Sequence, residues 1–199
     1  MNARPKVLLA GDSISFGYGP HVQARFNGVC EVTNLPANSG TSANLLAHLD
    51  EWLVRPAFDI IHLNCGLHDL ARERNAAGPR VGLEQYEANL REIFRRLKRE
   101  TRSLLAWATI TPVIDERHAA RKGFDRYEKD VEAYNVAALR AAQAAGLPVD
   151  DLHRVVEAGG REGCVGPDGV HMTEAGNTAL ADAVAAFVTD LLKGEKTHG

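Results

Sequence analysis

Short apolar runs alternate along the chain with longer segments in which apolar residues recur every three or four positions. The runs are too short for helices and are bounded by polar residues, so each predicts a buried strand. The five predicted strands are 6–10, 29–35, 58–65, 103–110 and 147–152. Strands that alternate with helices predict a parallel sheet with helices on both faces, so the expected fold class is α/β.

Three segments carry the spacing of an amphipathic helix. In LEQYEANLREIFRRLKRE, one face collects Leu83, Tyr86, Leu90, Ile93, Phe94 and Leu97. Further along, the same spacing recurs at Tyr127, Val131, Tyr134 and Ala138. Near the C-terminus it recurs at Leu180, Val184, Phe187, Val188 and Leu191. A stripe of this kind packs against a core, so these segments predict helices and no functional role.

The composition is that of an ordinary globular protein. Of the 199 residues, 45% are hydrophobic and 25% are charged, which argues against disorder and predicts one domain over 1–199. The net charge of −3 gives no electrostatic reason to expect nucleic acid as a partner. The longest early apolar run, Val7 to Ala10, is too short for a leader or a stable membrane insertion, so we expect a cytoplasmic protein. The widely spaced Cys30, Cys65 and Cys164 predict reduced, buried thiols.

The most charged segment is DERHAARKGFDRYEK, which covers 115–129 and follows the fourth predicted strand. Its basic residues could meet an anionic substrate, and the segment could wall a pocket. We expect instead a solvated loop and the start of a helix, with solvated side chains at Arg117, Arg121, Lys122 and Arg126.

Polar loops follow four of the predicted strands. They cover 11–13 after the first strand, 38–42 after the second, 66–69 after the third and 167–171 shortly after the fifth. In an open parallel sheet, the carboxyl ends of the strands are where ligands bind, so these loops are expected at one edge. They bring together a serine, glycines, two histidines and several carboxylates, which are the groups that nucleophilic catalysis uses.

Acyl transfer by a serine requires a neighbouring base, a carboxylate that orients the base, and N–H donors for the oxyanion. Ser13 follows a strand at the expected start of a helix, where its hydroxyl is exposed and its N–H is unpaired. Asp168 and His171 are three residues apart, so one loop can bring their side chains together. Gly40 can present its N–H with no side chain in the way. These residues predict a nucleophile at Ser13, a base at His171 and an ester as substrate.

Taken together, these motifs resemble the SGNH (GDSL-type) serine hydrolase superfamily. GDSIS resembles the first family block, with Ser13 as the nucleophile, and NSGTS resembles the second, whose glycine, here Gly40, gives an oxyanion N–H. GLHD resembles the third block, and DGVHMTEAG resembles the fifth, in which Asp168 and His171 complete the catalytic triad.

The resemblance covers about residues 6–192 and includes YEANLREIF, WATITPV and GLPVDDL. It implies a three-layer α/β/α sandwich with a flavodoxin-like, five-stranded parallel sheet. It also implies a hydrolase mechanism that uses no cofactor and no metal. The chain contains neither HExxH nor a paired CxxC, so the residues themselves predict no metal either.

One position departs from the family pattern. His68 stands where the third block normally has an asparagine, whose side chain donates to the oxyanion. A neutral imidazole also donates one N–H, so we expect His68 to be an oxyanion donor beside the amides of Ser13 and Gly40. The alternative is that His68 only packs against a neighbouring loop.

Three further polar residues are expected to support the site. Asp12 is expected to cap or buttress the turn before Ser13. Asn38 is expected to bond across to a neighbouring loop, with an ordinary turn asparagine as the alternative. Asp69 is expected to anchor the backbone of the loop that carries His68.

Other classes fit the residues less well. A nucleotide-binding protein of the flavodoxin or Rossmann type needs a glycine-rich loop directly after the first strand, and Gly17 and Gly19 come too late. An α/β-hydrolase elbow reads Gly-x-Ser-x-Gly, and Ser15 occupies the last position here. A carbohydrate- or lipid-binding descendant without turnover stays open. Relatives by resemblance act on acetylated sugars, lysophospholipids, thioesters and aryl esters. The short chain favours short acyl or acetyl esters, including acetylated carbohydrates, with a lysophospholipase or thioesterase as the alternative.

Overall fold

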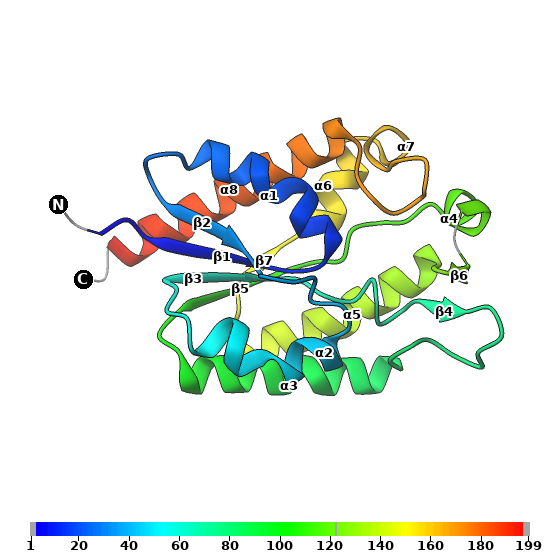
Figure 1. The fold of residues 1–199 in the computed structure, drawn as a ribbon, viewed down its shortest axis with the longest axis horizontal. Helices are drawn as coiled ribbons and strands as arrows, with labels where there is room; N and C mark the ends of the chain where they lie inside the picture. The colour runs from blue at the N-terminus through cyan, green and yellow to red at the C-terminus, as the bar shows by residue number, and fades with distance from the viewer. Residues whose placement is uncertain (1–2, 122, 197–199) are drawn as a thin grey trace.

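A parallel sheet forms the centre of the computed structural model, which describes residues 3–121 and 123–196 (Figure 1). Its strand order is β2-β1-β3-β5-β7, and all four strand pairs are parallel. Each strand lies inside a predicted segment: β1 Lys6–Ala10, β2 Glu31–Asn34, β3 Ile60–Leu63, β5 Leu104–Ala108 and β7 Val149–Asp150. The predicted α/β fold with a five-stranded parallel sheet is therefore confirmed.

Helices cover both faces of the sheet, which gives the three layers visible in Figure 1. One face carries α1 Ser13–Arg25, α6 Leu152–Ala158, α7 Arg161–Cys164 and α8 Glu174–Lys196. The other face carries α2 Ser42–Ala47, the π-helical segment η1 Asp50–Val54, α3 Leu83–Glu100 and α5 Glu128–Ala145. The predicted apolar stripes lie in α3, α5 and α8, although Leu83 at the start of α3 is exposed.

The core explains why the strands read as continuous apolar runs. Strands covered on both faces bury every side chain, and all residues of β3, which pairs with β1 and β5, are buried. His62 in β3 is paired inside this core through one ring nitrogen, since its Nε2 lies 2.9 Å from Oδ2 of the buried Asp150, whereas its buried Nδ1 has no hydrogen-bond partner among the described residues. The cysteines at 30, 65 and 164 are buried thiols, as predicted.

A small two-stranded sheet was missing from the sequence prediction. Strands β4 Arg72–Glu73 and β6 Phe124–Asp125 pair antiparallel, with Arg72 opposite Asp125. Two-residue strands are too short to show a periodicity, so their pattern could not be seen. This small sheet and α4 Asp115–Arg121 lie on the side of the molecule toward which the central strands point (Figure 1). Among the described residues, no helix combines the length and apolarity of a membrane span.

Candidate active site

The polar loops meet at the carboxyl edge of the sheet, beside the point where the strand order reverses around β1. This switch point is where open α/β sheets bind their ligands. The N–H of Ser39 donates to the carbonyl oxygen of Gly11 at 3.2 Å, which joins the first two loops. The N–H of Asn64 donates to the carbonyl oxygen of Ala10 at 2.8 Å, which joins the ends of β1 and β3.

Ser13, His171 and Asp168 form a hydrogen-bonded chain. Ser13 Oγ lies 2.9 Å from Nε2 of His171, and Nδ1 of His171 lies 2.6 Å from Oδ2 of Asp168. A proton on Nδ1 would be donated to the carboxylate and would leave Nε2 free to accept the serine hydroxyl. The His171 side chain is 47% exposed and that of Asp168 is 26% exposed, so solvent reaches the imidazole.

A tight turn holds Asp168 and His171 together. Oδ1 of Asp168 accepts the backbone N–H groups of Val170 and His171, at 3.1 and 3.0 Å. Gly169, which directly follows Asp168, has a φ of +75°, and a Cβ there would lie 2.5 Å from the Ile114 carbonyl oxygen. Burial by itself would raise the pKa of Asp168. The hydrogen bonds from the His171 ring and the two N–H groups outweigh it and lower that pKa to about 2, so the carboxylate is ionised at neutral pH.

The start of α1 positions Ser13. Asp12 is the N-cap, and its Oδ1 accepts the N–H of Ile14 at 3.0 Å. Ser13 is the first helical residue, so its own N–H has no acceptor within the helix. A Cβ on Gly11 would lie 2.9 Å from Ser15 Cβ, so the chain can turn this tightly only with glycine there.

In the second loop, Asn38 does not make the expected bond to a neighbouring loop. Among the described residues, its side chain bonds only within its own loop, where Oδ1 accepts the N–H of Gly40 at 2.8 Å. Asn38 is therefore a turn asparagine and does not reach a neighbouring loop. Gly40 has a φ of +63°, which suits glycine, and its N–H already has an acceptor.

The third loop is locked to the second by the side chain of Asp69. Both of its carboxylate oxygens accept the N–H of Ser42, at 2.9 and 3.0 Å, and Oδ1 also accepts the Ser42 hydroxyl. Asn89 of α3 donates to that hydroxyl at 2.9 Å. Burial raises the pKa of Asp69 to about 6, against the opposing effect of the Ser42 hydrogen bonds. Our sequence analysis missed Ser42 and Asn89, although an asparagine inside the apolar stripe of α3 was a visible signal.

His68 is half-buried beside these groups. Burial lowers the pKa of its imidazole, which keeps the ring neutral. The positive charges of Arg126 and His171 lower this pKa further, and the negative charge of Asp12 opposes them. Within the described part of the chain, no hydrogen bond to its ring nitrogens is formed. A neutral ring in this position has one N–H to donate.

The expectation of a solvated side chain is wrong for Arg126. Only 6% of this residue is exposed, because the unpredicted two-stranded sheet places it against the third loop, where its Nε donates to the Leu67 carbonyl oxygen. Arg117 is ion-paired with Glu162, since its Nη2 lies 2.5 Å from Glu162 Oε2. Of the other basic residues named with them, Lys122 and the side chain of Arg121 lie outside what the structure describes.

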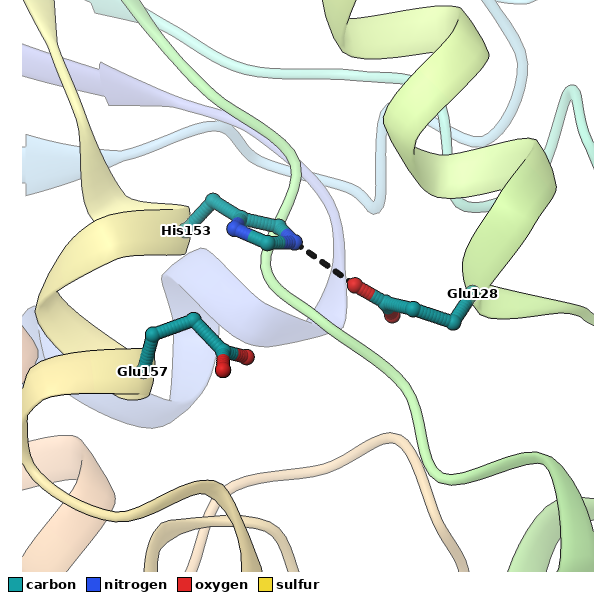
Figure 2. A group of neighbouring side chains, drawn as sticks. All are labelled: Glu128, His153 and Glu157. Atoms are coloured by element: carbon teal, nitrogen blue, oxygen red, sulfur yellow. Dashed lines mark hydrogen bonds and ion pairs between the residues drawn. The ribbon is translucent and has the colours of Figure 1, made fainter.

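A second cluster of titratable side chains has the composition of a metal site. Glu128, His153 and Glu157 place one potential ligand atom each within 4.8 Å of the others (Figure 2). His153 Nε2 lies 2.7 Å from Glu128 Oε1, and Arg161 bonds to Glu128 at 3.2 Å and to Glu157 at 2.6 Å. Because Arg161 already supplies a cation to both carboxylates, the cluster is a salt-bridge network that joins α5, α6 and α7.

This network predicts a pH-dependent contribution to stability. The hydrogen bond to Glu128 raises the pKa of His153, so the protonated ring is favoured in the folded protein. The contribution is complete below the unfolded histidine pKa of about 6.5 and is lost as pH rises through the higher folded value. We expect His153→Gln to lower the free energy of unfolding by about 1 kcal/mol near pH 6 and by clearly less near pH 9.

Urea unfolding of both proteins at the two pH values measures this difference. His21→Gln is the matched control, because Glu174, the 3.7 Å partner of His21, has an 81% exposed side chain and the pair is screened. An equal loss at the two pH values would contradict the protonated pair.

Comparisons with known proteins find similarity over most of the chain. The model of the GDSL-like Lipase/Acylhydrolase family matches residues 9–179. A lipase/acylhydrolase from Enterococcus faecalis superposes with a TM-score of 0.78 at 19% identity, over 92% of this chain and 95% of that one. No curated protein matches the chain.

Two further solved structures share the fold. An acetyl xylan esterase, AlAXEase, has a TM-score of 0.76 at 18% identity, over 92% of this chain and 99% of that one. The esterase EstA from Pseudoalteromonas sp., in a structure inhibited by monoethylphosphonate, has a TM-score of 0.71 at 13% identity. The match covers 94% of this chain and 98% of that one. At these identities the likeness concerns the fold.

Proposed function

The chain belongs to the GDSL-like lipase/acylhydrolase family, and on that premise we propose that it hydrolyses carboxylic esters through an acyl-enzyme formed on Ser13. The observation that carries the proposal is the hydrogen-bonded chain from Ser13 Oγ to His171 and on to Asp168. These are the contacts that a serine nucleophile, its base and the orienting carboxylate require.

In the acylation step, Ser13 Oγ attacks the ester carbonyl carbon while Nε2 of His171 takes the hydroxyl proton. The imidazolium that forms is stabilised by Asp168, which stays ionised. The tetrahedral intermediate then collapses, and its C–O bond to the alcohol breaks. His171 returns the proton to the leaving alcohol, and the acyl group stays on Ser13.

Three N–H groups are proposed to stabilise the tetrahedral oxyanion. The Ser13 amide is unpaired within α1, and the neutral ring of His68 has one donor. The Gly40 amide donates to Asn38 Oδ1, so the oxyanion must replace that oxygen as its acceptor. The Asn38 side chain is exposed and can rotate away at little cost.

In the deacylation step, a water molecule attacks the carbonyl carbon of the acyl group that is bonded to Ser13 Oγ. His171 takes one proton from this water. Collapse of the second tetrahedral intermediate breaks the bond to Ser13 Oγ, which recovers its proton from His171. The products are the carboxylic acid and the resting enzyme. The half-exposed position of the His171 side chain gives water a route to this base.

Short-chain acyl or acetyl esters are the proposed substrates, acetylated carbohydrates among them. The likeness to an acetyl xylan esterase supports this class, as does the small size of the chain. Lysophospholipid and thioester hydrolysis are the alternatives within the same mechanism. A series of para-nitrophenyl esters of increasing acyl length, measured beside acetylated sugars, separates these possibilities.

Reaction with a fluorophosphonate probe tests the mechanism directly. Such probes phosphonylate activated serine hydroxyls, so mass spectrometry of the digested protein should place the adduct on Ser13. Ser13→Ala is the control and should stay unlabelled. An unlabelled wild-type protein that still binds a sugar or lipid would indicate a descendant without turnover and would overturn the proposal.

His68→Ala tests the third oxyanion donor. Loss of one donor typically lowers kcat by about 10²-fold, and we expect that effect on short-chain esters. His68→Asn returns an amide donor and is expected to recover part of the loss. If kcat/KM for His68→Ala falls by less than about threefold, His68 only packs against its neighbours.

A further inference from the structure

A buried guanidinium lies beside the candidate active site. Arg126 follows β6 and is 6% exposed, and its Nε donates to the carbonyl oxygen of Leu67 at 2.6 Å. Its guanidinium carbon lies 4.9 Å from the centre of the Phe124 ring. Leu67 directly precedes His68, so these contacts hold the guanidinium against the loop that carries the proposed oxyanion donor.

The end of this side chain is left without an acceptor. Among the described residues, the only hydrogen bond of Arg126 is the one from Nε, and no carboxylate lies within 4.0 Å of its nitrogen atoms. Arginine is almost never fully buried unless it is paired. The nearby Arg80 and Arg117 are paired even though their side chains are 33% and 32% exposed, Arg80 with Glu73 at 2.6 Å and Arg117 with Glu162.

Burial and the charges of the site together set the pKa of Arg126. Burial lowers the pKa of Arg126 to about 10, and the longer-range attraction of Asp12 and Asp168 only partly opposes this. The guanidinium is therefore charged at neutral pH and under-compensated by negative charge. Asp12 precedes the proposed nucleophile and Asp168 belongs to the proposed triad, so the charge of Arg126 acts on both of these loops as well as on the third loop that it contacts.

We infer that the ester substrate carries an anionic group and that Arg126 binds it through Nη1 and Nη2. This inference rests on the proposed function and adds the chemical class of its substrate. With Nε engaged by Leu67, the two remaining nitrogens form the planar fork that matches the two oxygens of a carboxylate. The anionic group supplies the counter-ion that the described residues do not provide.

Two pairs of substrates test the inference and locate the anionic group. The mono-para-nitrophenyl ester of glutarate carries a carboxylate on its acyl part, and the mixed methyl para-nitrophenyl diester of glutarate is the neutral match. Para-acetoxybenzoate carries a carboxylate on its alcohol part, and its methyl ester is the neutral match. After correction for spontaneous hydrolysis, we expect kcat/KM of the wild-type protein to favour the acid over its neutral match by about 10-fold or more in one of the pairs.

Arg126→Gln is expected to lower kcat/KM for the favoured acid by about 10- to 100-fold and to change the neutral match far less. Arg126→Lys keeps the charge but not the fork, so an intermediate loss is expected. Arg117→Gln is the matched control, because it removes an arginine of the same region whose charge is paired with Glu162. It should leave the preference for the acid unchanged.

Several outcomes overturn the inference. One is an equal fall on acids and neutral esters in Arg126→Gln, which would mean that Arg126 only positions the loop of His68. Another is a wild-type protein that prefers the neutral ester in both pairs, and this result requires no variant to fold.

Binding is measured separately as the rise in melting temperature that glutarate and para-hydroxybenzoate give to Ser13→Ala, and the rise should vanish in Ser13→Ala/Arg126→Gln. Absent labelling of Ser13 together with retained anion binding would reject the proposed function and leave Arg126 as an anion site.

Discussion

Ser13→Ala is expected to lower kcat for para-nitrophenyl acetate by about 10⁴-fold or more. The substitution removes the oxygen that lies 2.9 Å from His171 Nε2, so no acyl-enzyme can form. Asp12 still caps α1 through the N–H of Ile14, so the fold should be retained. Release of para-nitrophenolate at saturating substrate, followed by absorbance, measures the loss.

Ser103→Ala is the matched control. Its hydroxyl donates to the Phe58 carbonyl oxygen at 2.7 Å, just before β5 and at the opposite edge of the sheet. This variant should keep wild-type kcat. If Ser13→Ala retains a rate near that of the wild-type protein, Ser13 has no part in the mechanism.

Asp168→Asn is expected to lower kcat by about 10²- to 10⁴-fold at neutral pH. Asparagine can keep the acceptor for the N–H groups of Val170 and His171, so the turn is expected to survive. Its amide group, however, cannot accept the Nδ1 proton of His171 as the carboxylate does. The imidazole then adopts the wrong tautomer or loses the stabilisation of its charged form.

Steady-state kinetics with a short-chain ester measure this effect, and a thermal melt checks that the turn is intact. Asp182→Asn provides the control, since Asp182 is an exposed residue of α8 that pairs with Arg25 at 2.6 Å. Because the pKa of Asp168 is about 2, its carboxylate does not titrate between neutral pH and about pH 4. A wild-type rate in Asp168→Asn would show that His171 needs no carboxylate partner.

The sheet and the Ser13–His171–Asp168 group were predictable because they follow from short sequence patterns and from the general geometry of parallel sheets. Strands buried on both faces read as apolar runs, and each observed strand falls inside its predicted segment. Asp168 and His171 are close because one turn holds them. Ser13 and His171 are 158 residues apart, and their meeting was predictable because parallel strands present their following loops at one edge.

The other features of the site depend on contacts between side chains that are far apart in the sequence or that have more than one acceptable partner, so no sequence pattern predicts them. The Asp69 carboxylate reaches Ser42 across 27 residues, and Asn89 reaches it across 47, so the network exists only in the folded chain. Asn38 had two acceptable partners, and the structure selects the N–H of its own loop. The two-residue strands β4 and β6 left no periodicity, so the burial of Arg126 behind them could not be foreseen.

The long separation between Ser13 and His171 has a consequence during synthesis. Chains fold from the N-terminus as they leave the ribosome, so β1, β2 and β3 can assemble while the C-terminal part is still untranslated. At that stage Ser13 lies without the imidazole proposed to activate it, because His171 is translated 158 residues later. Under the proposed mechanism, a nascent chain that ends before residue 171 therefore cannot turn over an ester, and activity requires that the loop with Asp168 and His171 has folded against the sheet.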